Sequence, residues 1–486
     1  MNDAAPQRLY AAHALLPDGW GRDVLLAWDG TGTLTAVQVA AAPPAGVPHA
    51  AGVLIPGLPN LHSHAFQRAF AGLTEYRRAA TGRDDRADNF WAWRELMYRV
   101  ALGVAPDQLE AIATQVYIEM LHAGYTAVCE FHYLHHDPQG RPYADPAEMS
   151  LRLLAAAQRA GIGLTLLPVL YQQAGFGAQP AHAEQRRFIK GTDALLALFE
   201  RLRRHVADAN AGASASASSS ANAGGAARVG IAPHSLRAVG PGALRDVVAG
   251  VQALDANAPI HLHIAEQPQE VRDCVVWSGQ RPVAWLLANA PVDARWCLVH
   301  ATHMNPAELQ GVAASGAVAG LCPTTEANLG DGVLDAAAYA AANGAWGIGS
   351  DSHASISGAE ELRLLEYTQR LAQHRRNVLA SAAQPQVAEH LWLGAVHGGA
   401  RASGRAIGGL RVGQQADFVV LETAGTLAGL APSQVLASHV FAHHGRSALR
   451  DVWVAGRQRV HAGAHALDRV ACEHFVAARG ALLSEV

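Results

Sequence analysis

Short apolar runs alternate with helical stretches along most of the chain. From Val53 onward eight runs are continuously apolar, which is typical of parallel strands buried on both faces. Segments with helical character, such as Pro106–Ala123 and Pro146–Ala160, lie between them. The eight runs are Val53–His64, Tyr125–His135, Gly161–Gln173, Val229–Leu236, Pro259–Glu266, Trp296–His303, Ala317–Thr324 and Ala345–His353. Eight such β/α repeats predict an α/β fold of the (β/α)8 TIM-barrel class.

The two ends of the chain show a different pattern. The first fifty residues contain short strand-like runs, at 23–28 and 34–39, separated by Gly and Asp turns. Glycine-bounded, β-rich segments return after Arg405, at 408–422 and 449–456. We therefore predict that residues 1–55 and 405–486 pair into one small β-sandwich domain, beside a barrel formed by residues 56–404.

One segment inside the predicted barrel has low complexity. Residues 207–227 consist almost entirely of Ala, Ser, Gly and Asn and contain no large apolar residue. Such a composition favours a flexible surface insertion, here placed before the fourth strand. We assign it no function.

Composition narrows the class of protein. Half of the 486 residues are hydrophobic, 16% are charged, and the net charge is −4, which does not suggest nucleic-acid or membrane-surface binding. No apolar run reaches 18 residues, and the N-terminus lacks the pattern of a signal peptide, so we expect a cytoplasmic protein. The five cysteines are scattered without a Cys-x-x-Cys pair, which argues against a disulfide framework or a cysteine zinc site.

Polar residues gather where the apolar runs end, and active sites of barrels lie at the C-terminal ends of the strands. His62 and His64 are two apart at the end of the first run, so both side chains should face the barrel mouth. His263 ends the fifth run and Asp351 ends the eighth. Any one of these residues could be a buried structural residue, since the chain has 25 histidines. That explanation is improbable for four such residues at strand ends. Three imidazoles and a carboxylate suit zinc, with iron or manganese as alternatives.

Two further residues lie near this set. Glu266 follows His263 by three residues, and His300 ends the sixth run. The fourth run, Val229–Leu236, contains no lysine that could bridge two metal ions. The only lysine, Lys190, falls in a helix-like segment that we expect to lie far from any strand end. The pattern therefore favours one metal ion per subunit.

These motifs resemble a known family. The patterns His-x-His at 62–64, His-x-x-Glu at 263–266, the strand-end His300 and Ser-Asp-Ser-His at 350–353 are similar to the deaminase branch of the amidohydrolase superfamily. More narrowly, four stretches resemble the formiminoglutamate deiminases of bacterial histidine degradation. They are residues 59–73, 90–94, 130–135 and 232–239. The resemblance covers nearly the whole chain, although residues 207–227 depart from the family's usual loop.

The resemblance implies a ligand set and a reaction. His62, His64, His263 and Asp351 would hold one Zn²⁺ per subunit, with Fe²⁺ an alternative. Asp351 would accept a proton from the attacking water. The two other catalytic residues would be His300, which orients Asp351, and Glu266, which carries the proton to the leaving nitrogen. The expected reaction converts N-formimino-L-glutamate and water into N-formyl-L-glutamate and ammonia.

A substrate with two carboxylates makes a separate demand. Arginine grips a carboxylate with two parallel hydrogen bonds, and an unpaired buried carboxylate is costly. We predict that Arg237 and Arg94 bind the carboxylates and that Gln67, Tyr133 and His234 complete the pocket. Two arginines of the same segment compete with Arg94, namely Arg77 and Arg83.

Two other functions remain open from the sequence. A deaminase of a cyclic base, such as guanine or cytosine, would use the same metal ligands but a pocket with aromatic or amide walls. A metal-free barrel that only binds its ligand is the second alternative, and such proteins usually lose ligands that this chain keeps. A homodimer is expected from the habit of the superfamily.

Overall fold

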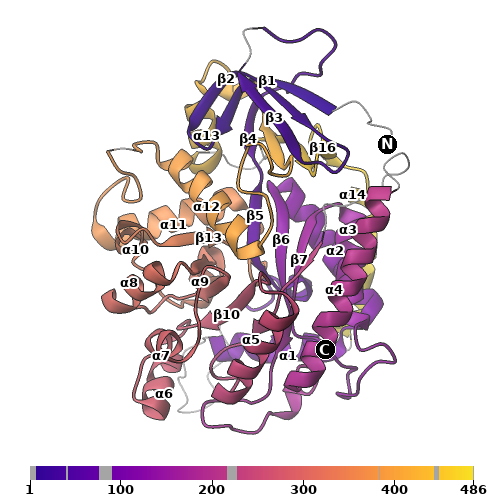
Figure 1. Ribbon diagram of the computed structural model, residues 1–486, viewed down its shortest axis with the longest axis vertical. Helices are drawn as coiled ribbons and strands as arrows, with labels where there is room; N and C mark the ends of the chain where they lie inside the picture. The colour runs from indigo at the N-terminus through magenta and orange to yellow at the C-terminus, as the bar shows by residue number, and fades with distance from the viewer. Residues whose placement is uncertain are drawn as a thin grey trace.

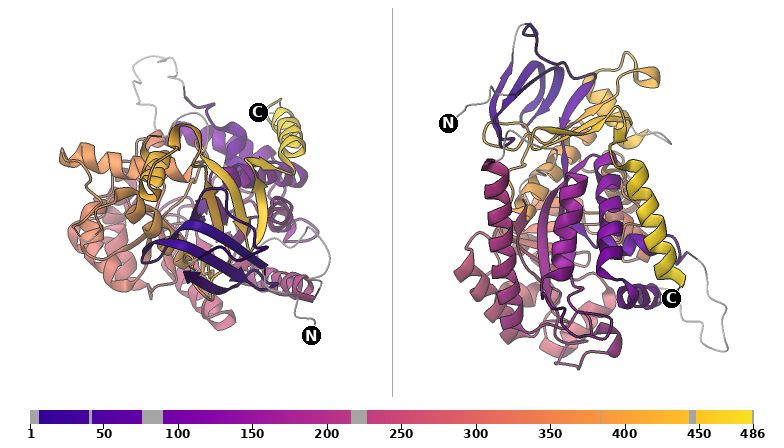
Figure 2. Two further views of the ribbon diagram at one scale, coloured as in Figure 1. Left: turned by 90° about the horizontal axis from the view of Figure 1, so that it is seen from above. Right: turned by 90° about the vertical axis from the view of Figure 1, so that its right-hand side faces the viewer.

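The computed structural model describes residues 7–39, 42–75, 90–215, 227–382, 384–442 and 448–484. A barrel surrounded by helices makes up the larger part, and a sheet built from both ends of the chain lies at one side of it (Figure 1). Figure 2 shows the same two parts from two further directions. Among the described residues, no helix combines the length and the apolar character needed to cross a bilayer.

The barrel is an all-parallel sheet. Its strands are β5 (Leu58–Ser63), β6 (Tyr125–His132), β7 (Gly163–Leu170), β8 (Arg228–Val229), β9 (Ala232–Pro233), β10 (Ile260–Ile264), β11 (Trp296–His300), β12 (Val318–Leu321) and β13 (Ala345–Ile348). The sheet β5–β8 and the sheet β10–β13 are joined by parallel bridges, Ile231 with Ile260 and Ser63 with Asp351, which close the ring. Each predicted apolar run contains one barrel strand, and the fourth run is divided into β8 and β9.

Helices lie between the barrel strands in the sequence, and most of them enclose the barrel on its outer side (Figures 1 and 2). They are η1 (Ala65–Phe70), α1 (Phe90–Gly103), α2 (Pro106–His122), α3 (Glu148–Ala160), η2 (Ala183–Gln185), α4 (Thr192–Ala215), α5 (Pro241–Leu254), α6 (Pro268–Ser278), α7 (Pro282–Asn289), α8 (Pro306–Ser315), α9 (Pro323–Leu329), α10 (Ala336–Ala341), α11 (Gly358–Gln373) and α12 (Val387–Ser403). Helix α8 shows how sharply the chain marks these elements. Asn305 caps its first turn, Pro306 follows, and Gly316 ends it with a φ of +78°.

Helix α4 corrects one prediction. We expected residues 207–227 to be a flexible insertion, but α4 continues to Ala215, so the first part of this tract is helical. The preceding turns are anchored by buried residues such as Phe199 and Leu202, and alanine, which dominates the tract, has the highest helix propensity. Residues 216–226 lie outside the described residues.

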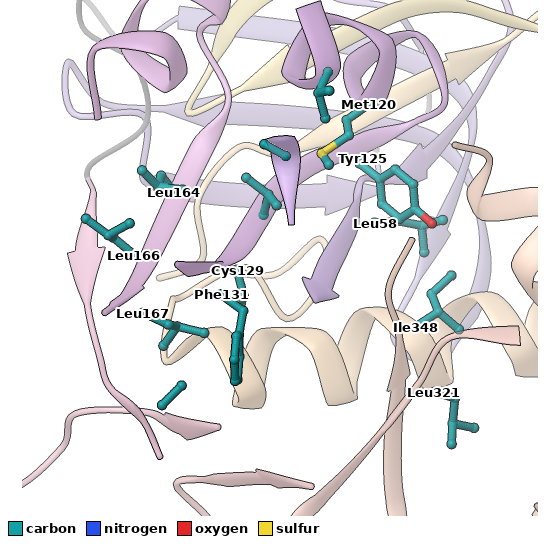
Figure 3. Packing of buried hydrophobic residues seen from close by; sticks show 14 of the residues in the cluster. Leu58, Met120, Tyr125, Cys129, Phe131, Leu164, Leu166, Leu167, Leu321 and Ile348 are labelled. Carbon is teal, nitrogen blue, oxygen red and sulfur yellow. The ribbon is translucent and has the colours of Figure 1, made fainter. Parts of the chain in front are cut away.

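Most barrel strands are buried along their whole length, so their apolar side chains fill the molecule inside and outside the ring. All eight residues of β6 are buried, and so are all eight of β7. Figure 3 shows side chains of this core, among them Leu58 of β5, Phe131 of β6 and Ile348 of β13. Polar groups are therefore presented mainly where the strands end, which is where the chemistry must be sought.

The terminal sheet contains β1 (Gln7–Leu16), β2 (Gly19–Trp28), β3 (Leu34–Val39), β4 (Val53–Pro56), β14 (Phe418–Leu421), β15 (Leu449–Val454), β16 (Arg457–His461) and β17 (Ala464–His465), in the order β17-β16-β15-β14-β4-β1-β2-β3. Its two halves meet because β4 pairs with both β1 and β14. The ring centroids of Trp28 in β2 and Trp453 in β15 are 5.7 Å apart although three strands separate β2 from β15, so the sheet is strongly curved. The remaining elements are η3 (Gly425–Leu427), α13 (Pro432–Phe441) and α14 (Asp468–Ser484), and α14 packs along α2.

Candidate active site

Four of the predicted ligands meet at the mouth of the barrel. The Nε2 atom of His62 lies 3.2 Å from Nε2 of His64 and 2.9 Å from Nε2 of His263. Oδ1 of Asp351 lies 3.3 Å from Nε2 of His62 and 3.4 Å from Nε2 of His64. Ligands at Zn–N distances of about 2.0–2.1 Å in a tetrahedron are roughly 3.3 Å apart, so these spacings fit a single cation at the centre.

The outer nitrogens of two of these rings are held by the backbone. Nδ1–H of His64 donates to the carbonyl of Phe131 at 2.9 Å, and Nδ1–H of His263 donates to the carbonyl of His234 at 3.2 Å. This tautomer leaves the Nε2 lone pair of each ring facing the common centre. Backbone carbonyls cannot change their position without moving a strand, so the two imidazoles are held in place before any ion binds.

The protonation states of the four groups suit a dication. Burial lowers the pKa of His62 to about 3 and also lowers the pKa values of His64 and His263, so all three rings are neutral and able to ligate. Burial alone would raise the pKa of Asp351, but its hydrogen bond and charge interaction with His62 outweigh this, and its pKa lies below the usual range. Three neutral nitrogens and one carboxylate form the donor set that the residue types predicted.

Two further groups face this cluster from neighbouring strands. Nε2 of His300 lies 3.7 Å from Oε1 of Glu266 and 3.9 Å from Oδ2 of Asp351. His300 and Asp351 both have left-handed backbone conformations, with φ of +66° and +45°, which residues other than glycine rarely adopt. The strained turns at the strand ends point both side chains at the same space.

Glu326 completes the surroundings of His300, and the sequence reasoning missed it. Its Oε1 lies 3.4 Å from Nδ1 of His300 and also accepts a hydrogen bond from the backbone N–H of Cys322 at 2.9 Å. Burial lowers the pKa of His300, but the carboxylates of Glu266, Glu326 and Asp351 outweigh this and raise it to about 10. A carboxylate in the first turn after the seventh strand was the signal in the sequence that could have identified Glu326.

Glu130 is a second carboxylate with no predicted role, although it lies within a stretch that carries the family resemblance. It is buried at β6, where its oxygens accept hydrogen bonds from Oγ of Ser63 at 2.5 Å and from the backbone N–H of Ala65 at 2.7 Å. Burial raises the pKa of Glu130 to about 7. These two bonds hold the residues on either side of His64, so Glu130 helps to fix the position of that imidazole.

All five residues predicted to bind the substrate line one pocket together with three of the four predicted metal ligands, His64, His263 and Asp351. Its walls also include Glu266 and His300, and aromatic rings cover much of the rest. The residues predicted from the sequence are Gln67, Arg94, Tyr133, His234 and Arg237. Arg77 and Arg83, which competed with Arg94 in the sequence, lie outside the described residues.

The polar groups of this pocket are arranged in two parts. Near His64, the Nε2–H of Gln67 donates to the hydroxyl of Tyr133 at 3.0 Å. Farther along, the guanidinium carbon of Arg94 lies 5.3 Å from the ring centroid of Tyr98. Burial lowers the pKa of Arg237, but the charges of nearby carboxylates, Glu270 foremost, raise it overall, so its guanidinium stays positive. Two guanidiniums in one concave site form an environment for anions.

Lys190 requires a correction. We expected it in a helix-like segment far from any strand end, but it lies in the connection between η2 and α4, and its side chain is buried. Its backbone N–H donates to the carbonyl of Tyr171, the residue directly after β7, at 3.0 Å. The path of this long connection, which folds back over the barrel mouth, was not readable from the sequence. Neither β8 nor β9 contains a lysine, and Lys190 is not among the residues that line the pocket.

Comparisons with known proteins agree with this geometry. Formimidoylglutamate deiminase from Pseudomonas aeruginosa is 50% identical over 475 residues, which are 98% of this chain and 99% of that protein. A 5-methylthioadenosine/S-adenosylhomocysteine deaminase from Haloarcula marismortui is 25% identical over 81% of this chain and 78% of its own length.

Solved structures give the same picture. An amidohydrolase from Brucella melitensis is 45% identical, with a TM-score of 0.88 over 98% of this chain and 100% of its own. An adenosine deaminase from Xanthomonas campestris, solved with bound zinc, shares the fold with a TM-score of 0.75 at 22% identity and covers 98% of both chains. A profile described as the amidohydrolase family matches residues 53–459, from the last strand before the barrel to the terminal sheet. The chain belongs to the amidohydrolase family.

Proposed function

We propose that this chain catalyses the hydrolytic deamination of N-formimino-L-glutamate in histidine degradation. The observation that carries the proposal is one pocket lined by two arginines and by His64, His263 and Asp351, which cluster with His62. The 50% identity to a formimidoylglutamate deiminase over nearly the full length of both chains supports the same substrate. In this reaction, water adds to the formimino carbon, the bond to the terminal nitrogen breaks, and ammonia leaves N-formyl-L-glutamate behind.

We propose that one zinc ion per subunit is held by the four ligands, and Fe²⁺ would suit the same donor set. The fit rests on three donor atoms that lie 2.9–3.3 Å from Nε2 of His62, and on the 3.4 Å between Nε2 of His64 and Oδ1 of Asp351. A bound zinc ion would polarise a coordinated water and lower the pKa of that water toward about 7. Three neutral rings and one carboxylate would leave a net charge of +1 on such a centre, which would stabilise a bound hydroxide as the nucleophile.

The chain's own groups supply a route for the protons. Asp351 directs Oδ1 to the imidazoles of His62 and His64 and Oδ2 toward His300, so Oδ2 can accept a proton from the attacking water. The Nε2–H of His300 would donate to Asp351 and fix the direction of that carboxylate. Burial raises the pKa of Glu266, which favours a carboxyl able to deliver a proton to the leaving nitrogen.

Substrate binding follows from charge. Arg94 and Arg237 would each pair with a carboxylate of the substrate, and Gln67, Tyr133 and His234 would hold the formimino end near the metal ligands. Aromatic rings also line this pocket, including Trp93 and Phe188, which is the feature that keeps a cyclic base as the second candidate. A base, however, carries no anionic groups to pair with two guanidiniums.

The test is direct. The purified protein is incubated with N-formimino-L-glutamate and, separately, with guanine and cytosine, and ammonia is measured together with the bound metal. We expect ammonia from N-formimino-L-glutamate alone, near one equivalent of metal, and loss of activity after chelation that zinc restores. Ammonia from a base but none from the glutamate derivative would reverse the ranking, and activity without any metal would exclude the metal-dependent route.

The proposal also includes three expectations about domain organisation, cellular location with oligomeric state, and partners. Residues 1–55 and 405–486 would form a β-sandwich domain beside the barrel of residues 56–404, as the curvature of the terminal sheet favours. The protein would act in the cytoplasm as a homodimer. Its partner would be a small dicarboxylate, with no nucleic acid or membrane involved.

A further inference from the structure

Gln185, in the short helix η2, connects two tyrosines of the pocket. Its Nε2 group donates to the hydroxyl of Tyr98 in α1 at 3.0 Å and to the hydroxyl of Tyr171, just after β7, at 2.8 Å. The side chain of Gln185 is only 1% exposed, whereas both tyrosines line the pocket. Two pocket walls from distant parts of the chain are therefore tied together by one buried amide.

The orientation of this amide is fixed by the backbone. Oε1 of Gln185 accepts a hydrogen bond from the backbone N–H of His182 at 2.9 Å. A backbone N–H can only donate, so the oxygen of the amide must face His182 and the NH₂ group must face the tyrosines. Both phenolic oxygens therefore accept from Gln185, and neither phenol can use its proton there.

The proton of each hydroxyl must go elsewhere. Among the described residues, neither the hydroxyl of Tyr98 nor that of Tyr171 donates to a carbonyl or carboxylate oxygen. A bond from one phenol to the other would use one proton and leave the second. At least one O–H group is thus available to the pocket, and hydroxyl protons of buried tyrosines normally find an acceptor.

The position of these hydroxyls suggests the acceptor. The guanidinium of Arg94 lies over the ring of Tyr98, and the ring of Tyr171 packs against His234 with centroids 4.7 Å apart. The charges of Arg94 and Arg237 both act on Tyr171. The phenols therefore lie in the arginine half of the pocket, where both arginine and phenol can donate and a ligand carboxylate would supply the missing acceptor.

We propose that Tyr98 and Tyr171 are substrate-binding residues that donate a hydrogen bond to a carboxylate of the substrate, with Gln185 as the positioning residue that directs their protons into the pocket. This inference rests on the proposed function and names which groups, besides the arginines, recognise the anionic end. It also gives the contact between η2 and α1 a role in substrate binding, although neither element contributes a proposed metal ligand.

Three substrates and four variants test it. Kinetics of Y98F, Y171F, the double variant and Q185L are measured on N-formimino-L-glutamate, N-formiminoglycine and N-formimino-4-aminobutanoate, the last two lacking one carboxylate each. We expect the double variant to lose about 10- to 100-fold in kcat/KM on the full substrate, mainly through KM, because a hydrogen bond to a charged group is removed. The loss should shrink on the analogue that lacks the carboxylate concerned. Y367F, at a partly exposed tyrosine on α11, is the matched control and should behave like the wild type.

The outcomes separate this inference from the proposed function. An equal loss on all three substrates, or wild-type kinetics of the double variant, would overturn the hydrogen bond to a carboxylate. Unfolding temperatures of all the variants show whether a loss reflects damage to the fold. If the wild type does not turn over N-formimino-L-glutamate, the proposed function fails. Calorimetric binding of glutarate to wild type and double variant then decides the inference alone: weaker binding by the variant supports it, and equal or absent binding overturns it.

Discussion

The two halves of the pocket are built from different parts of the fold. The strand-end half carries the proposed metal ligands, and in it His64 and His263 each bond a backbone carbonyl of the barrel. The arginine half comes from α1, η2 and the residues after β7 and β9, where side chains bond mostly to one another. The first half is fixed by the ring of strands and the second by the paths of its connections. We therefore expect changes in the connections to alter substrate choice more readily than they alter the chemistry.

The largest effect should come from breaking the strand-end half. In D351N the carboxylate that faces both the imidazoles and His300 becomes an amide, which is a poor ligand and a poor base. We expect kcat/KM to fall by roughly 10³-fold or more, with less bound metal by elemental analysis. D273N, on an exposed turn of α6, is the control. Activity within tenfold of the wild type would show that Asp351 belongs to neither task.

Breaking the arginine half should cost less and act differently. In R237M the pocket loses one guanidinium, while the metal ligands are untouched. We expect kcat/KM on N-formimino-L-glutamate to fall by roughly 30- to 1000-fold, as for other charged pairs that lose one partner, with metal content unchanged. R272A, on the exposed face of α6, should have no effect. Loss of metal in R237M would contradict the division of the pocket into two halves.

Glu326 tests whether the strand-end half extends beyond the ligands. In E326Q the charged partner of Nδ1 of His300 is replaced by a neutral amide of the same shape. We expect kcat to fall about 10- to 100-fold with little change in KM, the usual size of an effect from a group that orients an active-site residue. E326D keeps the charge on a side chain that is one methylene shorter, and its kcat should lie between those of E326Q and the wild type. An unchanged kcat would restrict Glu326 to a structural task.

The smallest effect on activity should come from His261, on the same face of β10 as His263 but two residues earlier. Its Nε2–H donates to the carbonyl of Ala402 at 2.8 Å, and burial lowers its pKa from 6.5 to about 4. Because the folded-state pKa is the lower one, this group's contribution to stability is full above pH 6.5 and is lost as the pH falls toward 4.

Over that range the loss should be about 3 kcal/mol. H261Q keeps the donor without the titration, so its unfolding free energy should depend less on pH between 6.5 and 4, with kcat near that of the wild type at pH 7.5. Parallel pH curves for the two proteins, measured by urea unfolding, would exclude His261 as the cause.

The same division explains what could be read from the sequence. His62, His64, His263 and Asp351 follow continuous apolar runs, and strand ends of a barrel meet by topology alone, so their convergence was predictable. Arg94 needed the resemblance to the family, because no pattern indicates that α1 reaches the barrel mouth.

Other parts of the site were out of reach because the path of a connection decides them. Gln185 and Lys190 lie in the long segment between β7 and α4, and neither spacing nor composition shows where that segment turns back. Glu326 was within reach, since it begins a helix directly after the seventh strand. The helical extension to Ala215 was not predicted, because the low complexity of the tract suggested a flexible loop although alanine has a high helix propensity.

The closure of the barrel has a consequence for assembly. Asp351 exchanges backbone hydrogen bonds with the ligand segment, donating to the carbonyl of His62 and accepting from the N–H of His64. Just before them, Nδ2 of Asn60 donates to Oγ of Ser350 at 2.6 Å across 290 residues of sequence. The seam that joins the first and last barrel strands therefore also carries the proposed cation site. During synthesis the four residues cannot come together until the eighth strand has been made. Binding of the ion would therefore stabilise only the closed barrel.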